Sequence, residues 1–206
     1  MEKRKSAFAL KHIATLLLFL LLSIASQATV SGASDGQAST SKKTTVLTPR
    51  GTPVDALVYS ETIITSQIPH LNDPWLAAVR SLDAQIISDA TRTYNCHGYT
   101  WYMSEGGTGR LYIEDPEPYL TDGSYMKIQE ANAVKGDKVV YGAGVHSAVV
   151  ADEPGWVISK WGDGPLVRHR LRDVPSEFGP DLELSFYRKA TSLSPPPNLR
   201  IIKITK

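Results

Sequence analysis

Residues 136–161, which read GDKVVYGAGVHSAVVADEPGWVISKW, decide the fold that this sequence predicts. Short runs rich in β-branched residues alternate there with turns that contain glycine or proline, a pattern typical of neighbouring antiparallel strands. With two similar runs farther along the chain, strands are predicted at 138–141, 147–151, 156–160, 166–169 and 184–188. The second half of the chain is therefore expected to form a small antiparallel sheet.

A helix is predicted before the strand region. Its apolar face is formed by residues at three- and four-residue spacing, namely Trp75, Val79, Leu82 and Ile86. Residues 73–74 (Asp-Pro) favour a helix start, with an N-cap followed by proline at the first helical position.

A second predicted helix carries Cys96. It begins at Asn95 or Cys96 and runs to about Ser104, where two glycines at 106–107 stop it. Helices therefore come first and strands later, which predicts the α+β class. The helix with the cysteine is expected to pack on the sheet that carries His146.

The amino terminus has the pattern of a secretory signal peptide. A basic segment over residues 1–12 precedes the apolar run 13–25 and a small-residue cleavage site at 26–28. That run is short for a bilayer span of about 20 residues. We expect a secreted or periplasmic protein with no membrane span after cleavage; retention as an anchor is the alternative.

Four segments are expected along the chain. The signal peptide at 1–28 is followed by a flexible leader rich in small polar residues at 29–45. One catalytic domain is expected over 46–190, because a chain of 206 residues is typical of a single domain plus tails. A proline-rich spacer and tail occupy 191–206.

Composition and charge exclude some classes of function. The chain is 42% apolar and 21% charged, which is ordinary for a globular domain with a core. The first 28 residues hold four of its 22 basic residues and one of its 21 acidic residues, so the remainder has a formal net charge of −2. Nucleic-acid binders show a strong basic excess, so no nucleic-acid partner is expected.

Cys96 is the only cysteine of the chain, so an internal disulfide is impossible. Such a residue is an intermolecular link, an inert buried thiol or a reactive group. The start of a helix favours the reactive alternative, because its dipole and free N–H groups lower the pKa of a thiol. The same N–H groups could stabilise an oxyanion. A thiol nucleophile also needs a base, and His146 follows a glycine-rich turn at the start of a strand.

Two segments resemble a known family. Residues 94–99 (YNCHGY) are similar to the aromatic-Asp-Cys-Ser-Gly-aliphatic nucleophile motif of NlpC-type cell-wall peptidases and the related CHAP amidases. Residues 136–150 resemble their Gly-Asp strand and the next strand, which carries the catalytic histidine. The resemblance covers about residues 75–170, with 50 residues between cysteine and histidine. It implies a papain-like cysteine hydrolase without a cofactor, acting on peptide-like or cell-wall amides through Cys96 as nucleophile and His146 as base.

The third catalytic position departs from that family. Its members place a polar residue on the next strand to orient the imidazole, and here that strand reads WVISKW over 156–161. Ser159 is the nearest polar candidate. Lys160 is less suited, because a cation disfavours protonation of an adjacent imidazole. His169 lies one strand later and is a second alternative.

Substrate-binding or oxyanion roles are predicted for the polar and aromatic neighbours Tyr94, Asn95, His97 and Trp161. Adjacent side chains diverge on a helix, so His97 is expected to act as a cap or substrate-wall residue, with the role of base as an alternative.

Several alternatives stay open. An inert Cys96 and a core histidine at His146 would make the chain a catalytically inactive binding or effector module on the same fold. A thiol acyltransferase would differ from a hydrolase only in its acceptor. A zinc site built from Cys96, His97, His146 and His169 is disfavoured, because adjacent Cys and His suit one tetrahedral site poorly, so no metal is expected.

Overall fold

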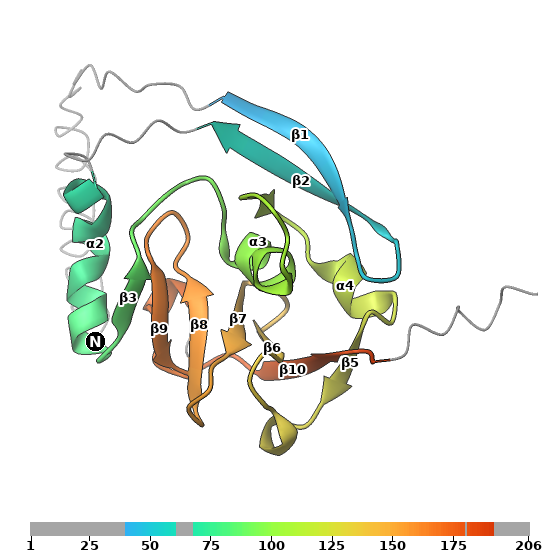
Figure 1. Cartoon of the computed structure of the whole chain (residues 1–206). Coiled ribbons are helices and arrows are strands. Elements are labelled where there is room, and N and C mark those ends of the chain that lie inside the picture. The colour runs from blue at the N-terminus through green and yellow to red at the C-terminus, as the bar shows by residue number, and fades with distance from the viewer. Residues whose placement is uncertain (1–39, 61–67, 180, 192–206) are drawn as a thin grey trace, which may run out of the picture. The chain divides into compact units, whose positions relative to one another are not determined.

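A seven-stranded antiparallel sheet is the frame of the computed structural model (Figure 1). The structure describes residues 40–60, 68–179 and 181–191. In spatial order the strands are β3 (Gln85–Ser88), β9 (Leu166–Arg170), β8 (Trp156–Lys160), β7 (His146–Val150), β6 (Lys138–Tyr141), β10 (Leu184–Lys189) and β5 (Tyr125–Ile128).

The predicted antiparallel meander is confirmed. Strands β6, β7, β8 and β9 follow one another in the chain and lie side by side in the sheet. Strands β6 and β8 have the predicted bounds, whereas β7 begins one residue earlier than predicted, at His146. The mixture of helices with antiparallel sheets confirms the α+β class.

A second sheet has three strands, β1 (Thr40–Leu47), β2 (Pro53–Ser60) and β4 (Tyr112–Ile113). Strands β1 and β2 pair along their whole length around a turn in which Gly51 has φ 88°. The predicted flexible leader is therefore wrong for residues 40–45, which lie in β1. Small polar residues suit an exposed hairpin strand as well as a leader, and composition alone does not separate the two.

The first predicted helix exists but begins earlier than its sequence indicates. Helix α2 (Ile68–Ser81) contains Pro74 in its interior, so the Asp-Pro pair at 73–74 is not the helix start. An N-cap signal is local and does not exclude an additional segment of helix before it.

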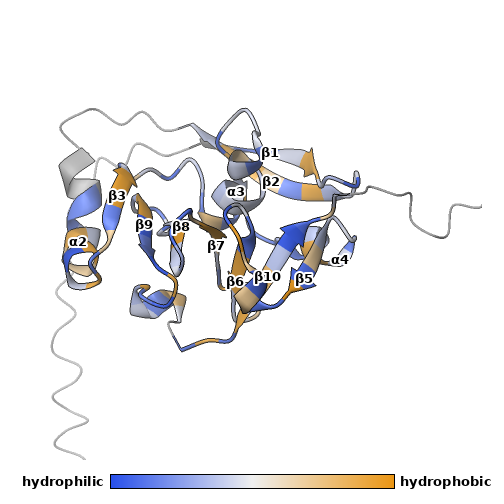
Figure 2. Cartoon of the chain, turned by 60° about the horizontal axis from the view of Figure 1, so that its bottom comes forward, coloured by the Kyte–Doolittle hydropathy of each residue, from blue (hydrophilic) through white to orange (hydrophobic). Residues whose placement is uncertain are grey.

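The end of α2 also differs from the prediction. The backbone N–H of Ala84 donates to the Val79 carbonyl at 2.9 Å, and Asp83 has a left-handed φ of 49°. This is the geometry of a Schellman cap, which closes a helix. Ile86 therefore lies in β3, where it is exposed at the hydrophobic edge of the large sheet (Figure 2).

Short helical elements connect the sheets. Helix α3 (Cys96–Trp101) ends before the predicted Ser104. The 3-10 turn η2 (Met103–Glu105) follows it and ends at Gly106 with φ 90°, where a stop was expected. The others are α4 (Glu117–Thr121), η3 (Glu130–Asn132) and η4 (Ser176–Phe178).

Successive strand residues point to opposite faces of the large sheet, and a different set of side chains packs on each face. Val140 packs with residues of α3, α4 and the small sheet, including Trp101 and Tyr119. Val139 and Ala148 pack on the other side, in a cluster joined by Val150, Phe178 and Phe186. Helix α3 contacts β7 and β8 and lies between β7 and the β1–β2 hairpin (Figure 1).

No helix in the described part of the chain is long and apolar enough to cross a bilayer. The predicted signal peptide at 1–28, the leader to residue 39 and nearly all of the predicted tail lie outside the described residues.

Candidate functional site

Asn95 fixes the start of the helix that carries the cysteine. Its backbone is extended, and its side-chain Oδ1 accepts hydrogen bonds from the N–H groups of Gly98 at 2.9 Å and Ile113 at 3.1 Å. Its Nδ2 donates to the Ile113 carbonyl at 2.7 Å. The side chain thus caps α3 and joins it to β4. These contacts correct the expectation that Asn95 binds substrate, because backbone groups already occupy both polar atoms of its amide.

Gly98 allows α3 to lie directly against the chain before β4. A Cβ atom at this position would stand 1.7 Å from the carbonyl oxygen of Leu111 and 2.9 Å from its carbonyl carbon. No side chain fits there, so the approach of the two backbones requires glycine. Together with the Asn95 cap, this contact sets where the first turn of α3 lies.

Cys96 is the first residue of α3, and two histidines flank its thiol. The cysteine is only 7% exposed. Burial raises the pKa of the thiol, but the charges of His97 and His146 and hydrogen bonding with both rings outweigh that effect. The pKa of Cys96 therefore lies well below its ordinary value, and the site favours the thiolate.

His97 is held between α3 and β7. Its Nδ1 lies 2.8 Å from Ser147 Oγ, and its Nε2 lies 3.1 Å from the carbonyl oxygen of Gly144. Burial lowers the pKa of His97, but Cys96, the Gly144 carbonyl and Asp115 raise it above its ordinary value. His97 is thus part of the site, and not the cap or substrate wall that its sequence position predicted.

His146 is fully buried at the start of β7. Its ring stacks on Phe178, with centroids 4.3 Å apart, and lies 5.2 Å from the ring of Tyr141. Among the described residues, neither of its ring nitrogens has a well-aligned hydrogen-bond partner. Its interaction with Cys96 is therefore one of nearby charge and loosely aligned hydrogen bonding.

The predicted orienting residue, Ser159, makes no hydrogen bond to His146. Its Oγ lies 2.7 Å from His169 Nε2, and His169 Nδ1 lies 2.8 Å from the carbonyl oxygen of Arg170. Burial, followed by the charge of His146, lowers the pKa of His169 to about 4. A neutral His169 thus donates from Nδ1 to the carbonyl and accepts at Nε2 from the serine hydroxyl.

Lys160 anchors the loop that precedes Cys96. It is fully buried, and its Nζ donates to the carbonyl oxygens of Thr91 at 2.8 Å and Gly162 at 2.5 Å. The same atom lies 5.1 Å from the centre of the Tyr94 ring. Lys160 therefore contacts the loop before α3 and makes no hydrogen bond to His146, and the buried Tyr94 is a packing residue of that loop.

Trp161 belongs to the core. It is fully buried, and its ring lies 6.0 Å from that of Trp75 and 5.6 Å from that of His169. This corrects the expectation that Trp161 contacts substrate, because no part of its side chain reaches an open surface.

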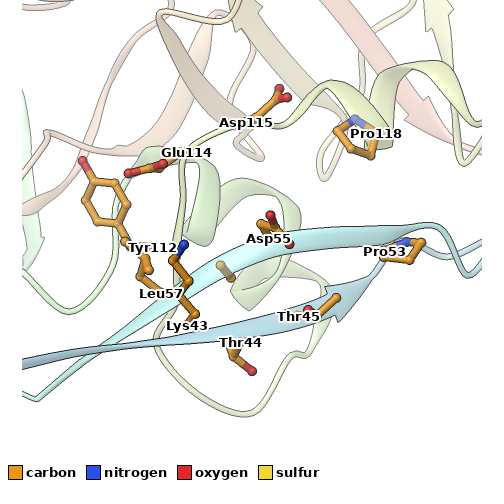
Figure 3. A pocket seen from close by; sticks show the side chains of 11 residues that line it. Lys43, Thr44, Thr45, Pro53, Asp55, Leu57, Tyr112, Glu114, Asp115 and Pro118 are labelled. Carbon is orange, nitrogen blue, oxygen red and sulfur yellow. The ribbon is translucent and has the colours of Figure 1, made fainter.

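A pocket of about 660 Å³ opens between the β1–β2 hairpin and residues 112–118 (Figure 3). Cys96 does not line it, but Tyr112 does and connects the two. Burial raises the pKa of Tyr112, and the negative charges of Asp163 and then Cys96 raise it further. The thiol is therefore near enough for its charge to act on one residue of the pocket lining. The lining side chains are Lys43, Thr44, Thr45, Pro53, Asp55, Ala56, Leu57, Tyr112, Glu114, Asp115 and Pro118.

Comparisons with known proteins do not add to this geometry. A scan of protein-family models, a search of curated proteins and a search of solved structures each found no match to the chain. Within the described ranges, no three histidine, cysteine, aspartate or glutamate side chains gather as a metal site. The site therefore has to be interpreted from its own contacts.

The structure brings together Cys96, His97 and His146, and it places Ser159 and His169 in a separate hydrogen-bonded pair. Sequence reasoning missed Ser147, the partner of His97. Strand alternation placed Ser147 on the face opposite His146, but nothing in the sequence indicated that His97 would lie on that face.

Proposed function

We propose that this chain is a thiol hydrolase of the papain-like class, in which the Cys96 thiolate attacks an amide carbonyl. The observation that carries the proposal is a buried thiol at a helix start, with His97 and His146 lowering its pKa. A buried thiol in apolar surroundings would have a raised pKa and would be inert. The opposite shift is typical of a nucleophile.

The reaction follows from the roles available to the two groups. The thiolate of Cys96 adds to the carbonyl carbon, the carbon–nitrogen bond breaks, and the leaving amine takes a proton from the His146 imidazolium. A thioester remains. Neutral His146 then removes a proton from water, which attacks the thioester and releases the thiolate. His146 gives one proton and regains one, so the cycle closes.

Several features support the papain-like class and its substrates. The helix with Cys96 packs on β7, the central strand of the large sheet, which begins at His146. A pocket is lined by Tyr112, a residue on which the charge of Cys96 acts. By resemblance, the substrate is a peptide-like amide such as a cell-wall peptide, and export directed by residues 1–28 would deliver the protein to it. An acceptor other than water would make the same site an acyltransferase.

A catalytically inactive binding module is a second candidate. Cys96 is only 7% exposed, His146 is fully buried, and no described residue holds the His146 ring through a well-aligned hydrogen bond. A module of this kind would keep the fold without offering its thiol to a substrate.

The pH dependence of alkylation separates these candidates. Cys96 is the only cysteine, so uptake of iodoacetamide by the folded chain reports on one thiol. We expect a rate that follows a pKa clearly below the unperturbed value of about 8.5. The same chain unfolded in urea is the control and should show the unperturbed value.

A folded protein whose profile matches the unfolded control would contradict the nucleophile. A folded protein that does not react at any pH would favour the binding module. Because the thiol is buried, the position of the titration on the pH axis is decisive, whereas the absolute rate also depends on access.

A further inference from the structure

Among the described residues, no polar side chain orients the imidazole of His146, because neither of its ring nitrogens has a well-aligned hydrogen-bond partner. Ser159, the polar residue on the next strand, bonds to His169 instead. The ring of His146 is nonetheless fully buried. The contacts that hold this ring therefore lie on its faces, and those faces meet aromatic side chains.

A stack of parallel rings ends on the imidazole of His146. The centre of the Phe178 ring lies 4.3 Å from the centre of the imidazole, and the two planes are inclined by only 14°. The centre of the Trp75 ring lies 6.1 Å from that of Phe178, with an inclination of 4°. The ring of Tyr141 lies 5.2 Å from the imidazole at 55°. The plane of the imidazole is thus matched by rings from α2 and η4.

The segment between β9 and β10 carries η4, and the end of β6 holds both ends of that segment. At its start, the Tyr141 hydroxyl donates to the Leu171 carbonyl at 2.7 Å. At its end, the Gly142 N–H donates to the Glu183 carbonyl at 2.8 Å. Tyr141 is also the cross-strand neighbour of His146. The strand beside the imidazole therefore also fixes where η4 lies.

Phe178 itself is held by two groups of apolar side chains. It packs against the cluster under β6 and β7 and also against the cluster that contains Trp161 and α2. A ring in contact with two clusters has little freedom to turn away. An aromatic pair stabilises a structure about as much as a neutral hydrogen bond does, so one contact can take the place of the other.

We infer that Phe178 is the positioning residue of the proposed base, and that its ring holds the imidazole of His146 where related sites use a polar third residue. The inference rests on the proposed function, because it completes the same thiol site. A hydrogen-bond partner would select which ring nitrogen carries the proton. A stacked phenyl ring fixes the plane of the imidazole and leaves that choice open.

The test follows hydrolysis of 4-nitrophenyl acetate by variants of the full-length chain. Acylation of Cys96 releases one nitrophenolate per thiol as a burst, and later release requires His146 to remove a proton from water. Phe178→Leu keeps an apolar side chain but no ring. It should keep the burst and slow the later turnover about two- to tenfold, the factor that loss of one aromatic pair represents. Phe178→Tyr keeps the ring and should restore wild-type turnover.

Val174→Ala is the matched control for a loss of packing. Val174 belongs to the same cluster that Phe178 packs against, but it adds no ring to the stack. This variant should lose stability in urea and keep wild-type turnover per folded molecule. Equal turnover in Phe178→Leu and Val174→Ala, or a failure of Phe178→Tyr to restore it, would overturn the inference. An active wild type would leave the proposed function in place in either case.

NMR of the unaltered protein tests the stack without any substitution. Nuclear Overhauser effects should join the ring protons of His146 to those of Phe178, and their absence would overturn the inference by itself. The His146 ring protons should also move downfield in Phe178→Leu, because they lose the ring current of the phenyl group. A wild-type chain that hydrolyses the ester no faster than Cys96→Ala would instead refute the proposed function, and the inference with it.

Discussion

At the residue scale, the acidity of one thiol is decided by contacts that reach it from two elements. Burial opposes ionisation of Cys96, and two imidazoles reverse that effect. One imidazole is the next residue in the chain, and the other arrives from a strand 50 residues later. The side chain that holds the helix start in place, Asn95, does so entirely through backbone groups.

Replacing Asn95 by alanine should destabilise the domain by about 2 to 3 kcal/mol, because the variant loses an N-cap and two further buried hydrogen bonds. Urea denaturation would show a lower midpoint with an unchanged slope. Asn95→Asp is the matched control. It keeps the oxygen that accepts from Gly98 and Ile113 and should lose less stability. Equal losses in the two variants would contradict the capping role.

At the element scale, helix α3 is short and depends on its neighbours. It has six residues and is followed at once by the turn η2. Lys138, from β6, donates to Ser104 at 2.9 Å and forms an ion pair with Glu105 at 2.5 Å. These contacts tie the end of the helical region to the sheet, as Asn95 ties its beginning to β4.

Gly98→Ala should unfold or strongly destabilise the domain, because its new methyl group would overlap the Leu111 carbonyl, which is backbone and cannot move aside alone. Gly107→Ala is the matched control. A Cβ there meets only the ring of Tyr102, a side chain that can rotate away. Circular dichroism during thermal unfolding would compare the two, and similar melting temperatures would refute the close approach at Gly98.

Lys138→Met should cost about 2 kcal/mol or more, because among the described residues it leaves the partly buried carboxylate of Glu105 with Lys189 as its one remaining ion partner. Adding Glu105→Gln should restore much of the loss, since the uncompensated charge is then removed. Chemical denaturation of the two variants and the wild type measures this coupling.

The same pair predicts a dependence on pH. Burial raises the pKa of Glu105, but Lys138 and Lys189 outweigh it and hold that pKa below its ordinary value of 4.5. The stabilisation by Glu105 is therefore complete above that value and is lost as the pH falls through the lower folded value. The stability difference between wild type and Lys138→Met should narrow in acid, and a constant difference would contradict the ion pair.

Local sequence patterns predicted the positions of the strands better than the contacts between side chains of different strands. The strands of the meander are encoded in runs of four or five residues between turns, so β6 and β8 were predicted with their observed bounds. The contact between Ser159 and His169 was not predictable, because it depends on cross-strand register. Cys96 and His146 were predicted as a pair from the order and spacing of the two motifs. The bonding of His97 to β7 was not predicted, because it depends on how α3 packs on the sheet.

At the scale of the whole molecule, the site is assembled where two sheets meet. The small sheet contributes Tyr112 and the pocket wall, and the large sheet contributes His146. Helix α3 lies between β7 and the hairpin (Figure 1). Tyr112 is thus the residue that belongs to the pocket lining and also responds to the charge of Cys96.

The chain as a whole should be insensitive to reductant. Its one cysteine is only 7% exposed, so folded molecules have no internal disulfide, and the thiol is not exposed enough to meet the thiol of a second folded molecule. We expect the same melting temperature with and without dithiothreitol. Non-reducing gels should show covalent dimers only after oxidation of urea-unfolded protein, and Cys96→Ser should abolish them. Dimers formed by the folded protein would show that the thiol is exposed.

The order of strands in the large sheet has a consequence for how the protein is made. Strand β10 lies between β6 and β5, although residues 142–183 separate it from β6 in the chain. During synthesis, β5 and one edge of β6 have no partner strand until residues 184–189 have been made, because β10 pairs with both of them. A growing chain that has already produced Cys96, His97 and His146 thus still lacks a complete sheet, and its last described strand is the one that joins the two parts.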